Sequence, residues 1–148
     1  MKTLNALTPQ PHRIMIADGI SLSSHFLEHV SQHGNQAVII SDSQVAPLYA
    51  EAIQTHLATA IPTLCFTLPT GEHHKNRASK AAIEDFLQAH HADKKTVLIA
   101  LGGGVLTDIT GFTAATYLRG IAVFYVPTTM LAMVDAAIGG KTGINTSY

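Results

Sequence analysis

Three consecutive glycines, Gly102, Gly103 and Gly104, form the stretch of this sequence whose chemistry is easiest to foresee. Glycine can adopt positive φ and lets a ligand approach bare backbone. If a helix begins directly after the glycines, its first N–H groups and the positive end of its dipole point at the same place. Such a corner favours a phosphate or pyrophosphate ligand, although a tight turn without a ligand would also accommodate these glycines.

The segments on both sides of the glycines have the patterns that this corner requires. Residues 96–101 are apolar or β-branched without polar alternation, which is typical of a strand buried on both faces of a parallel sheet. Val105, Ile109 and Phe112 then recur at helical spacing, which predicts a helix to about Leu118. The glycines therefore stand at a strand-to-helix turn.

The same alternation of strands and helices extends along the chain. Residues 1–11 contain two prolines and no clear period, so they are interpreted as a lead-in. The patterns predict strands at 12–17, 37–40, 63–68, 96–101 and 122–126, and helices at 22–33, 45–57, 78–91, 105–118 and 128–138. They indicate one α/β domain over residues 1–148 with a mostly parallel sheet and flanking helices.

Polar side chains follow four of the predicted strands at the point where each strand ends. Right-handed crossovers bring the carboxyl ends of parallel strands to one edge, where ligands bind in open α/β sheets. We therefore expect several polar groups to lie at one edge: Asp42, Glu72, Lys75, Asp108, Thr128 and Thr129.

Several of these residues also have structural interpretations. Asp42 could bind a ribose or cap the helix that follows it, and both roles could hold at once. Glu72 and Lys75, three residues apart, could form a surface ion pair, and Asp108 could complement the helix dipole. Thr107 occupies the third glycine position of the dinucleotide fingerprint, and the acidic residue expected about 20 residues later is absent.

Asp135 and Lys141 form a second pair of candidates. Asp135 lies in the otherwise apolar helix predicted at 128–138, and a buried carboxylate needs a partner. Lys141 is one loop away and could be that partner. The pair is either a structural ion pair or part of a polar site for a charged substrate.

Composition and motif spacing exclude several classes of protein. The 148 residues carry a net charge of −1 without a basic stripe, which argues against nucleic acid, and their apolar stretches are too interrupted for a membrane span. The single Cys65 is expected to be a buried core thiol, which fits a reducing, cytoplasmic compartment. Residues 139–142 lack the earlier glycine of a P-loop, and the histidine pairs at 73–74 and 90–91 lack metal-ligand spacing.

Taken together, the motifs closely resemble 3-dehydroquinate synthase. The residues that carry the resemblance are 102–108, 119–120, 126–135 and 139–145, with 41–43 and 71–75 upstream. Three positions depart from the usual pattern: His73-His74 replaces a Gln-Tyr-like pair, Thr107 replaces a frequent glycine, and Ala136-Ala137 replaces a frequent Ser-Ser.

The resemblance implies a Rossmann-like NAD-binding domain of a shikimate-pathway lyase. Such enzymes convert a seven-carbon keto sugar-acid phosphate (DAHP) to dehydroquinate, with transient oxidation by NAD, phosphate elimination, reduction and aldol closure. A divalent metal, zinc or cobalt, polarises the hydroxyl that is oxidised. The family's metal ligands lie in a helical C-terminal domain, and Tyr148 precedes it. We therefore expect an N-terminal half without metal ligands that is inactive alone and forms a homodimer.

The resemblance also assigns roles to individual residues. Asp42 would hold the adenosine ribose, and Arg119 would reach the substrate phosphate in the partner subunit. Asp135, Lys141 and Arg119 would be catalytic, with Lys141 also near the nicotinamide. The remaining cofactor contacts would be Thr70, Gly71, Glu72, His73, His74 and Lys75 in one loop, Gly103, Gly104, Val105, Leu106, Thr107 and Asp108 in the next, and Thr128 and Thr129 after the last strand.

Three alternative functions share parts of this pattern. Another sugar-phosphate cyclase would close a different ring. A polyol dehydrogenase of the iron-dependent or glycerol type would release NADH, whereas the sequence of Asp135 followed by Gly140-Lys141-Thr142 favours a cyclase. A non-catalytic nucleotide-binding module would bind NAD without turnover.

Overall fold

A four-stranded parallel sheet forms the centre of the computed structural model, which describes residues 2–5 and 13–146. Its strands are β3 (Gln36–Asp42), β4 (Thr63–Leu68), β5 (Thr96–Gly102) and β6 (Ala122–Pro127), in the order β4-β3-β5-β6. Each neighbouring pair is parallel. The predicted α/β fold with a parallel sheet is therefore confirmed.

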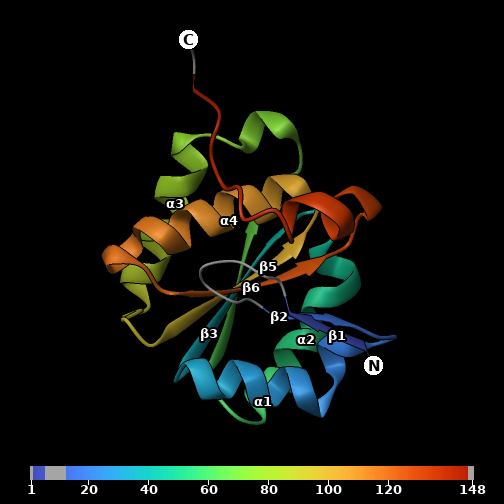
Figure 1. The fold of residues 1–148 in the computed structure, drawn as a ribbon. Helices are drawn as coiled ribbons and strands as arrows, with labels where there is room; N and C mark the ends of the chain where they lie inside the picture. The colour runs from blue at the N-terminus through green and yellow to red at the C-terminus, as the bar shows by residue number, and fades with distance from the viewer. Residues whose placement is uncertain (1, 6–12, 147–148) are drawn as a thin grey trace.

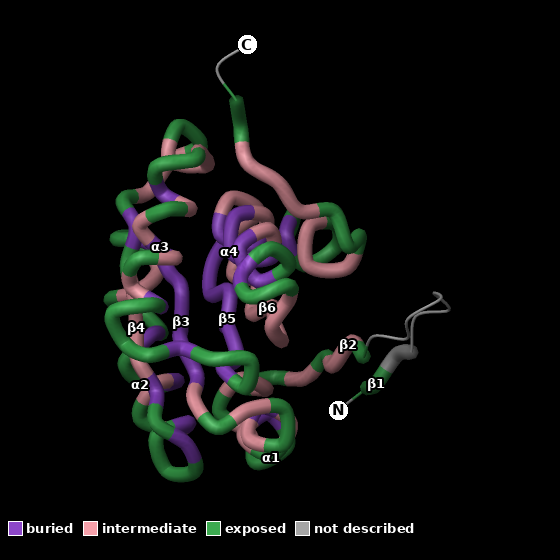
Figure 2. Tube along the Cα trace, turned by 90° about the vertical axis from the view of Figure 1, so that its left-hand side faces the viewer, coloured by how far each residue is buried: buried purple, intermediate pink, exposed green. Residues whose placement is uncertain are grey.

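The two central strands separate two hydrophobic cores. All seven residues of β5 are buried, as its unbroken apolar sequence predicts. Successive side chains point to opposite faces, so that Ile39 and Ile99 enter one core while Ile40 and Leu98 enter the other. Figure 2 shows these buried strands between layers of helices.

Helices cover both faces of the sheet (Figure 1). One core contains residues of α1 (Ser24–His33) and α2 (Ala46–Ala58), and the other contains residues of α3 (Arg77–Ala89) and α4 (Gly104–Thr116). Short 3₁₀ turns add η1 (Ile20–Leu22), η2 (Glu72–His74) and η3 (Tyr117–Arg119). Among the described residues, none of the helices combines the length and the hydropathy that a membrane-spanning segment requires.

The N-terminal part differs from its prediction as a lead-in. Strand β1 (Lys2–Asn5) pairs antiparallel with β2 (Arg13–Ile16) in a separate two-stranded sheet. The sequence of β1, KTLN, contains a single apolar residue and so shows no alternation, and only the pairing with β2 reveals this strand. The strand predicted at 12–17 is confirmed as β2, and the rest of the lead-in, residues 6–12, lies outside the described residues.

The segment predicted as a helix at 128–138 is shorter and more exposed than expected. It is helical from 130 to 136, with π-helical η4 at Ala132–Ala136. Met130 is 75% exposed and Leu131 71% exposed, so its apolar residues do not form a buried face. Cys65 also differs, because it lies on the edge strand β4 and is half-buried; burial still raises the pKa of its thiol.

Candidate functional site

The carboxyl ends of all four parallel strands meet at one edge, and hydrogen bonds join the loops that follow them. The Ser43 N–H, after β3, donates to the carbonyl of Leu68 at the end of β4 at 2.9 Å. The Thr128 N–H, after β6, donates to the carbonyl of Gly102 at the end of β5 at 3.0 Å. The loops that carry most of the predicted site residues therefore begin side by side.

Asp42 caps the turn that leads into α2. Its Oδ1 accepts hydrogen bonds from the N–H groups of Gln44 at 2.9 Å and Val45 at 3.0 Å, and the residue is only 6% exposed. The N-cap of α2 is Val45, which has no side-chain cap hydrogen bond, so Asp42 stabilises the turn before the helix and is not its N-cap. The ribose contact stays a prediction.

The glycine turn ends β5 and begins α4 with bare backbone. Gly102 has φ of 157°, and a Cβ there would lie 2.9 Å from Leu106 Cγ. Gly103, at the N-cap, supplies no side-chain hydrogen bond, and the first turn of α4 contains no acidic residue. The positive end of the α4 dipole is therefore not neutralised by a side chain of its own first turn.

Thr107 is compatible with this turn even though the fingerprint has glycine there. Its side chain is buried, and its Oγ1 donates to the carbonyl of Gly103 at 3.1 Å. The hydroxyl therefore points back along the helix and stabilises the turn. Thr129 packs from the other side, because a Cβ on Gly103 would lie 3.2 Å from Thr129 Cγ2.

The loop between β4 and α3 has a fixed shape. Gly71 has φ of 121°, and a Cβ there would lie 2.7 Å from the His73 ring. Glu72, His73 and His74 form η2, and Asn76 caps α3 by accepting a hydrogen bond from the Ser79 N–H at 2.9 Å. The predicted contacts Thr70 to Lys75 are thus presented on a single turn that requires glycine at its start.

An ion pair connects this loop to α4. Lys75 Nζ lies 2.5 Å from Asp108 Oδ2 and 3.8 Å from Glu72 Oε1. The side chains of Lys75 and Asp108 are 17% and 22% exposed, so the pair is largely shielded from water. The expected Glu72–Lys75 contact is present, but Asp108 is the closer partner of Lys75.

Residues 139–146, here called the strap, cross back over α4 to the same loop. The Gly143 N–H donates to the Asp108 carbonyl at 3.3 Å, and the Asn145 N–H donates to the Lys75 carbonyl at 2.7 Å. Asn145 Nδ2 also donates to Glu72 Oε1 at 2.8 Å. The sequence analysis assigns no role to Asn145, although Asn145 ends the segment 139–145 that carries part of the family resemblance.

Gly111 allows the strap to pack closely on α4. A Cβ at this position would lie 2.4 Å from Thr142 Cγ2 and 2.4 Å from Tyr125 Oη. Burial, reinforced by the nearby charge of Asp108, raises the pKa of the Tyr125 phenol. Tyr125 therefore remains a neutral hydroxyl beside the strap, and it is a further residue that the sequence analysis missed.

The predicted pairing of Asp135 with Lys141 is wrong. Asp135 is exposed, and the ion pairs among the described residues are Lys75 with Glu72, Lys75 with Asp108, and Lys80 with Glu84. Most of the large apolar side chains on this short helix are themselves exposed, so the helix has no buried face that would enclose the Asp135 carboxylate. Any catalytic role of the two residues stays a prediction.

Arg119 lies at the opposite edge of the sheet from the other candidates. The 13-residue helix α4 starts at the glycine turn and runs back for about 20 Å before Arg119 is reached. Leu118 and Arg119 both have positive φ, 48° and 67°, and both side chains are exposed. The fold therefore does not bring Arg119 to the site of its own chain.

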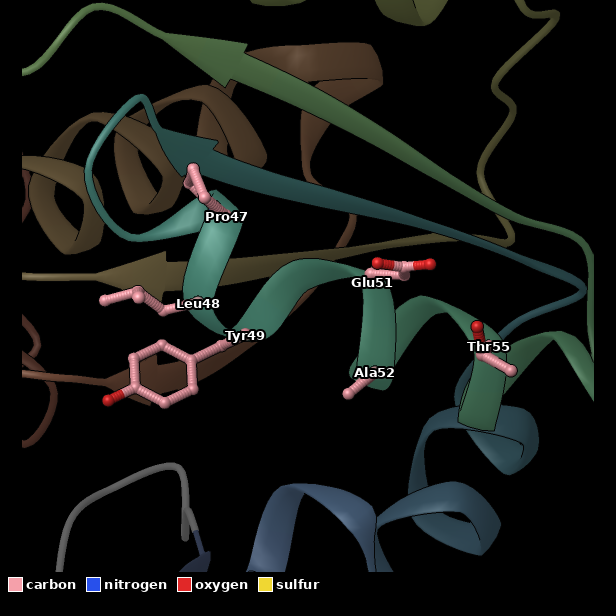
Figure 3. Close-up of a pocket in the computed structure, with 6 residues that line it drawn as sticks. All are labelled: Pro47, Leu48, Tyr49, Glu51, Ala52 and Thr55. Carbon is pink, nitrogen blue, oxygen red and sulfur yellow. The ribbon is translucent and has the colours of Figure 1, made fainter.

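A metal centre or a surface groove could also mark a functional site. Among the described residues, no group of three or more His, Cys, Asp or Glu side chains could hold a metal ion. A shallow groove on the outer face of α2 contains none of the predicted site residues (Figure 3); it is lined by Pro47, Leu48, Tyr49, Glu51, Ala52 and Thr55. The strand-end loops therefore remain the candidate site.

Comparison with known proteins finds relatives that match nearly the whole chain. A family model described as 3-dehydroquinate synthase N-terminal matches residues 65–148. The chain belongs to this family. The 3-dehydroquinate synthase of Neisseria meningitidis serogroup C is 45% identical over 149 residues, covering 98% of this chain and 41% of the relative. The chain thus spans about two fifths of that relative's length.

Solved structures show the same fold in sugar-phosphate cyclases. A 2-deoxy-scyllo-inosose synthase complexed with carbaglucose-6-phosphate, NAD⁺ and Co²⁺ has a TM-score of 0.91 at 22% identity, covering 99% of this chain and 40% of that chain. The 2-epi-5-epi-valiolone synthase of Streptomyces hygroscopicus, with NAD⁺ and Zn²⁺ bound, has a TM-score of 0.81 at 27% identity. The match covers 97% of this chain and 39% of that chain. The fold of this family member is therefore Rossmann-like.

Proposed function

We propose that this chain is the NAD-binding part of a 3-dehydroquinate synthase, the lyase that forms dehydroquinate from DAHP in the shikimate pathway. The observation that carries the proposal is the bare N-terminus of α4, with no acidic residue in its first turn, at the meeting point of four strand-end loops. Free N–H groups at a positive helix end suit a pyrophosphate. Family membership and the NAD⁺-bound cyclase structures support the same ligand.

The residues present fit a dinucleotide. The amides from Gly103 to Leu106 would receive the pyrophosphate, while Thr107 and Asp108 hold the turn and the neighbouring loop. Asp42 has one oxygen engaged in the turn before α2 and would offer the other to the adenosine ribose. The loop of Thr70 to Lys75 would cover the nucleotide, and Thr128 and Thr129 would lie beside the nicotinamide half.

The chemistry would divide between this chain and the rest of the polypeptide. When bound, NAD supplies a hydride acceptor that is regenerated within the reaction. In this chain Lys141 would hold an anionic group of the substrate, and Asp135 would accept a hydrogen bond from the substrate. The described residues do not fit a metal site, so we assign the zinc or cobalt ligands to the part that the relatives have in addition.

Two surface features support a partner for this chain. Met130, Leu131 and Val134 are exposed next to the candidate site, and clustered apolar side chains mark contact surfaces. We assign this surface to the further domain of the full-length enzyme.

Arg119, which faces away from the site, would serve the substrate phosphate of a second subunit in a homodimer, because its planar guanidinium binds phosphate in a bidentate manner. We place the enzyme in the cytoplasm.

Joining this chain to the remaining segment of the Neisseria meningitidis relative tests the proposed activity. The chimera, supplied with DAHP, NAD and zinc, is expected to release phosphate and dehydroquinate without net NADH. The chain alone should bind NAD in a calorimetric titration but should not turn over. The chimera carrying Lys141→Ala serves as the control for substrate binding.

Two results would contradict the proposal. Net NADH on addition of glycerol or another polyol would identify a dehydrogenase instead. Turnover of DAHP by the 148-residue chain alone would show that no second domain is needed.

A further inference from the structure

Asn145 makes two hydrogen bonds to the loop of Gly71 to Lys75 from the far end of the described chain. Its backbone N–H donates to the Lys75 carbonyl at 2.7 Å, and its side-chain Nδ2 donates to Glu72 Oε1 at 2.8 Å. The strap is held again at Gly143, whose N–H donates to the Asp108 carbonyl at 3.3 Å. The strap therefore binds both elements that the Lys75–Asp108 ion pair joins.

Glu72 has no closer polar partner than Asn145 among the described residues. The Lys75 ammonium is 3.8 Å from the Glu72 carboxylate and is engaged by Asp108 at 2.5 Å. The Glu72 side chain is 64% exposed, so packing alone does not fix its rotamer. Without the Asn145 amide, a ligand that uses Glu72 would have to order this side chain itself, which weakens binding.

We propose that Asn145 is a positioning residue for the bound dinucleotide. Its amide holds the Glu72 carboxylate, and its N–H holds the Lys75 carbonyl, in the arrangement that receives the ligand. The inference rests on the proposed function, because it takes the loop of Gly71 to Lys75 as part of an NAD site.

The same contacts couple two parts of the site. Lys141 lies four residues before Asn145 on the strap, so a loop that holds Asn145 in place also restricts the position of Lys141. Coupling of this kind is reciprocal. If NAD at the loop strengthens the binding of a second ligand at Lys141, the second ligand must strengthen NAD binding by the same factor.

A double-mutant cycle tests the side-chain bond. The dissociation constant for NAD is measured by calorimetry on the 148-residue chain for wild type, Asn145→Asp, Glu72→Gln and the double variant. Asn145→Asp sets a carboxylate against the Glu72 carboxylate, so NAD binding should weaken by about tenfold. In the Glu72→Gln background the new amide can donate to the new carboxylate, and the same substitution should change binding by less than about twofold.

A second measurement needs no ligand. Amide hydrogen exchange at His74 and Lys75 in the ligand-free chain should be several-fold faster in Asn145→Asp than in wild type, because the loop loses its anchor. Asn35→Asp is the matched control, because it makes the same charge change on an exposed residue just before β3, at the opposite edge of the sheet. It should change neither the dissociation constant for NAD nor the amide exchange at His74 and Lys75.

The possible failures are distinguishable. If wild type does not bind NAD, the proposed function fails, and the exchange measurement alone decides whether Asn145 holds the loop. If wild type binds NAD but Asn145→Asp has equal effects in both backgrounds, or leaves exchange unchanged, the role of Asn145 is overturned.

Discussion

At the level of single residues, the Lys75–Asp108 ion pair is the contact with the clearest energetic consequence. It joins two segments 33 residues apart and is mostly shielded from water. Asp108→Asn leaves a largely buried ammonium with only the distant Glu72 carboxylate, so the free energy of unfolding should fall by about 1–2 kcal/mol. Urea unfolding at neutral pH measures this change.

The Lys80–Glu84 pair provides the control for that prediction. Its N–O distance is also 2.5 Å and its exposure is similar, but both residues lie within α3. Glu84→Gln should therefore cost only about 0.5 kcal/mol, as is usual for pairs one turn apart on a helix. An equal or larger loss for Glu84→Gln would show that the Lys75–Asp108 pair does not tie the loop to α4.

Tyr125 predicts a dependence of stability on alkaline pH. Burial and the charge of Asp108 raise the pKa of its phenol above the value near 10 of an unfolded tyrosine. The folded state therefore binds this proton more tightly, and the resulting stability is complete below about pH 10 and is lost as pH rises through the folded pKa. Urea unfolding from about pH 9 to 11.5 should show the free energy of unfolding of wild type falling relative to that of Tyr125→Phe above about pH 10; a difference independent of pH would contradict this assignment.

At the level of elements, the packing of the strap on α4 depends on Gly111. Alanine would gain up to about 1 kcal/mol in helix propensity, but its Cβ would collide with Thr142 and Tyr125, and overpacking costs about 1–3 kcal/mol. Gly111→Ala should therefore lower the free energy of unfolding by about 1 kcal/mol and accelerate amide exchange at Gly143 and Asn145. Gly143→Ala, where a Cβ would meet nothing within 4 Å, is the control and should change stability by less than about 0.5 kcal/mol. A stabilised Gly111→Ala variant with unchanged exchange would show that the strap does not pack there.

The elements also show where sequence patterns are informative. Strand β4 was predicted with its observed bounds, and β3 and β5 within two residues at each end, because buried parallel strands leave long apolar runs with clear ends. Residues 128–138 have the same apolar character but are largely exposed, since hydrophobicity does not indicate which surface will cover a segment. The strap has no periodicity, and its hydrogen bonds to distant residues leave no local trace.

At the level of the whole molecule, topology explains which site predictions could succeed. Parallel strands placed Asp42, the loop of Gly71 to Lys75, the glycine turn and Thr128 at one edge, as the alternation of elements predicted. The partner of Lys75 and the exposure of Asp135 depend on how loops fold against each other, which spacing along the chain does not encode. The same topology explains why Arg119 lies away from the site. Helix α4 begins at the edge that carries the site and ends at the opposite edge, where Arg119 follows it.

The central claim is that the loops of one sheet edge together bind NAD, and titration of the ¹⁵N-labelled chain with NAD tests it most directly. Backbone amide shift changes are expected to cluster at Asp42, Gly71 to Lys75, Gly103 to Asp108 and Thr129, and to saturate together. Saturating changes confined to the groove of α2 or to the end of α4 near Arg119 would contradict the account, as would the absence of any change at millimolar NAD.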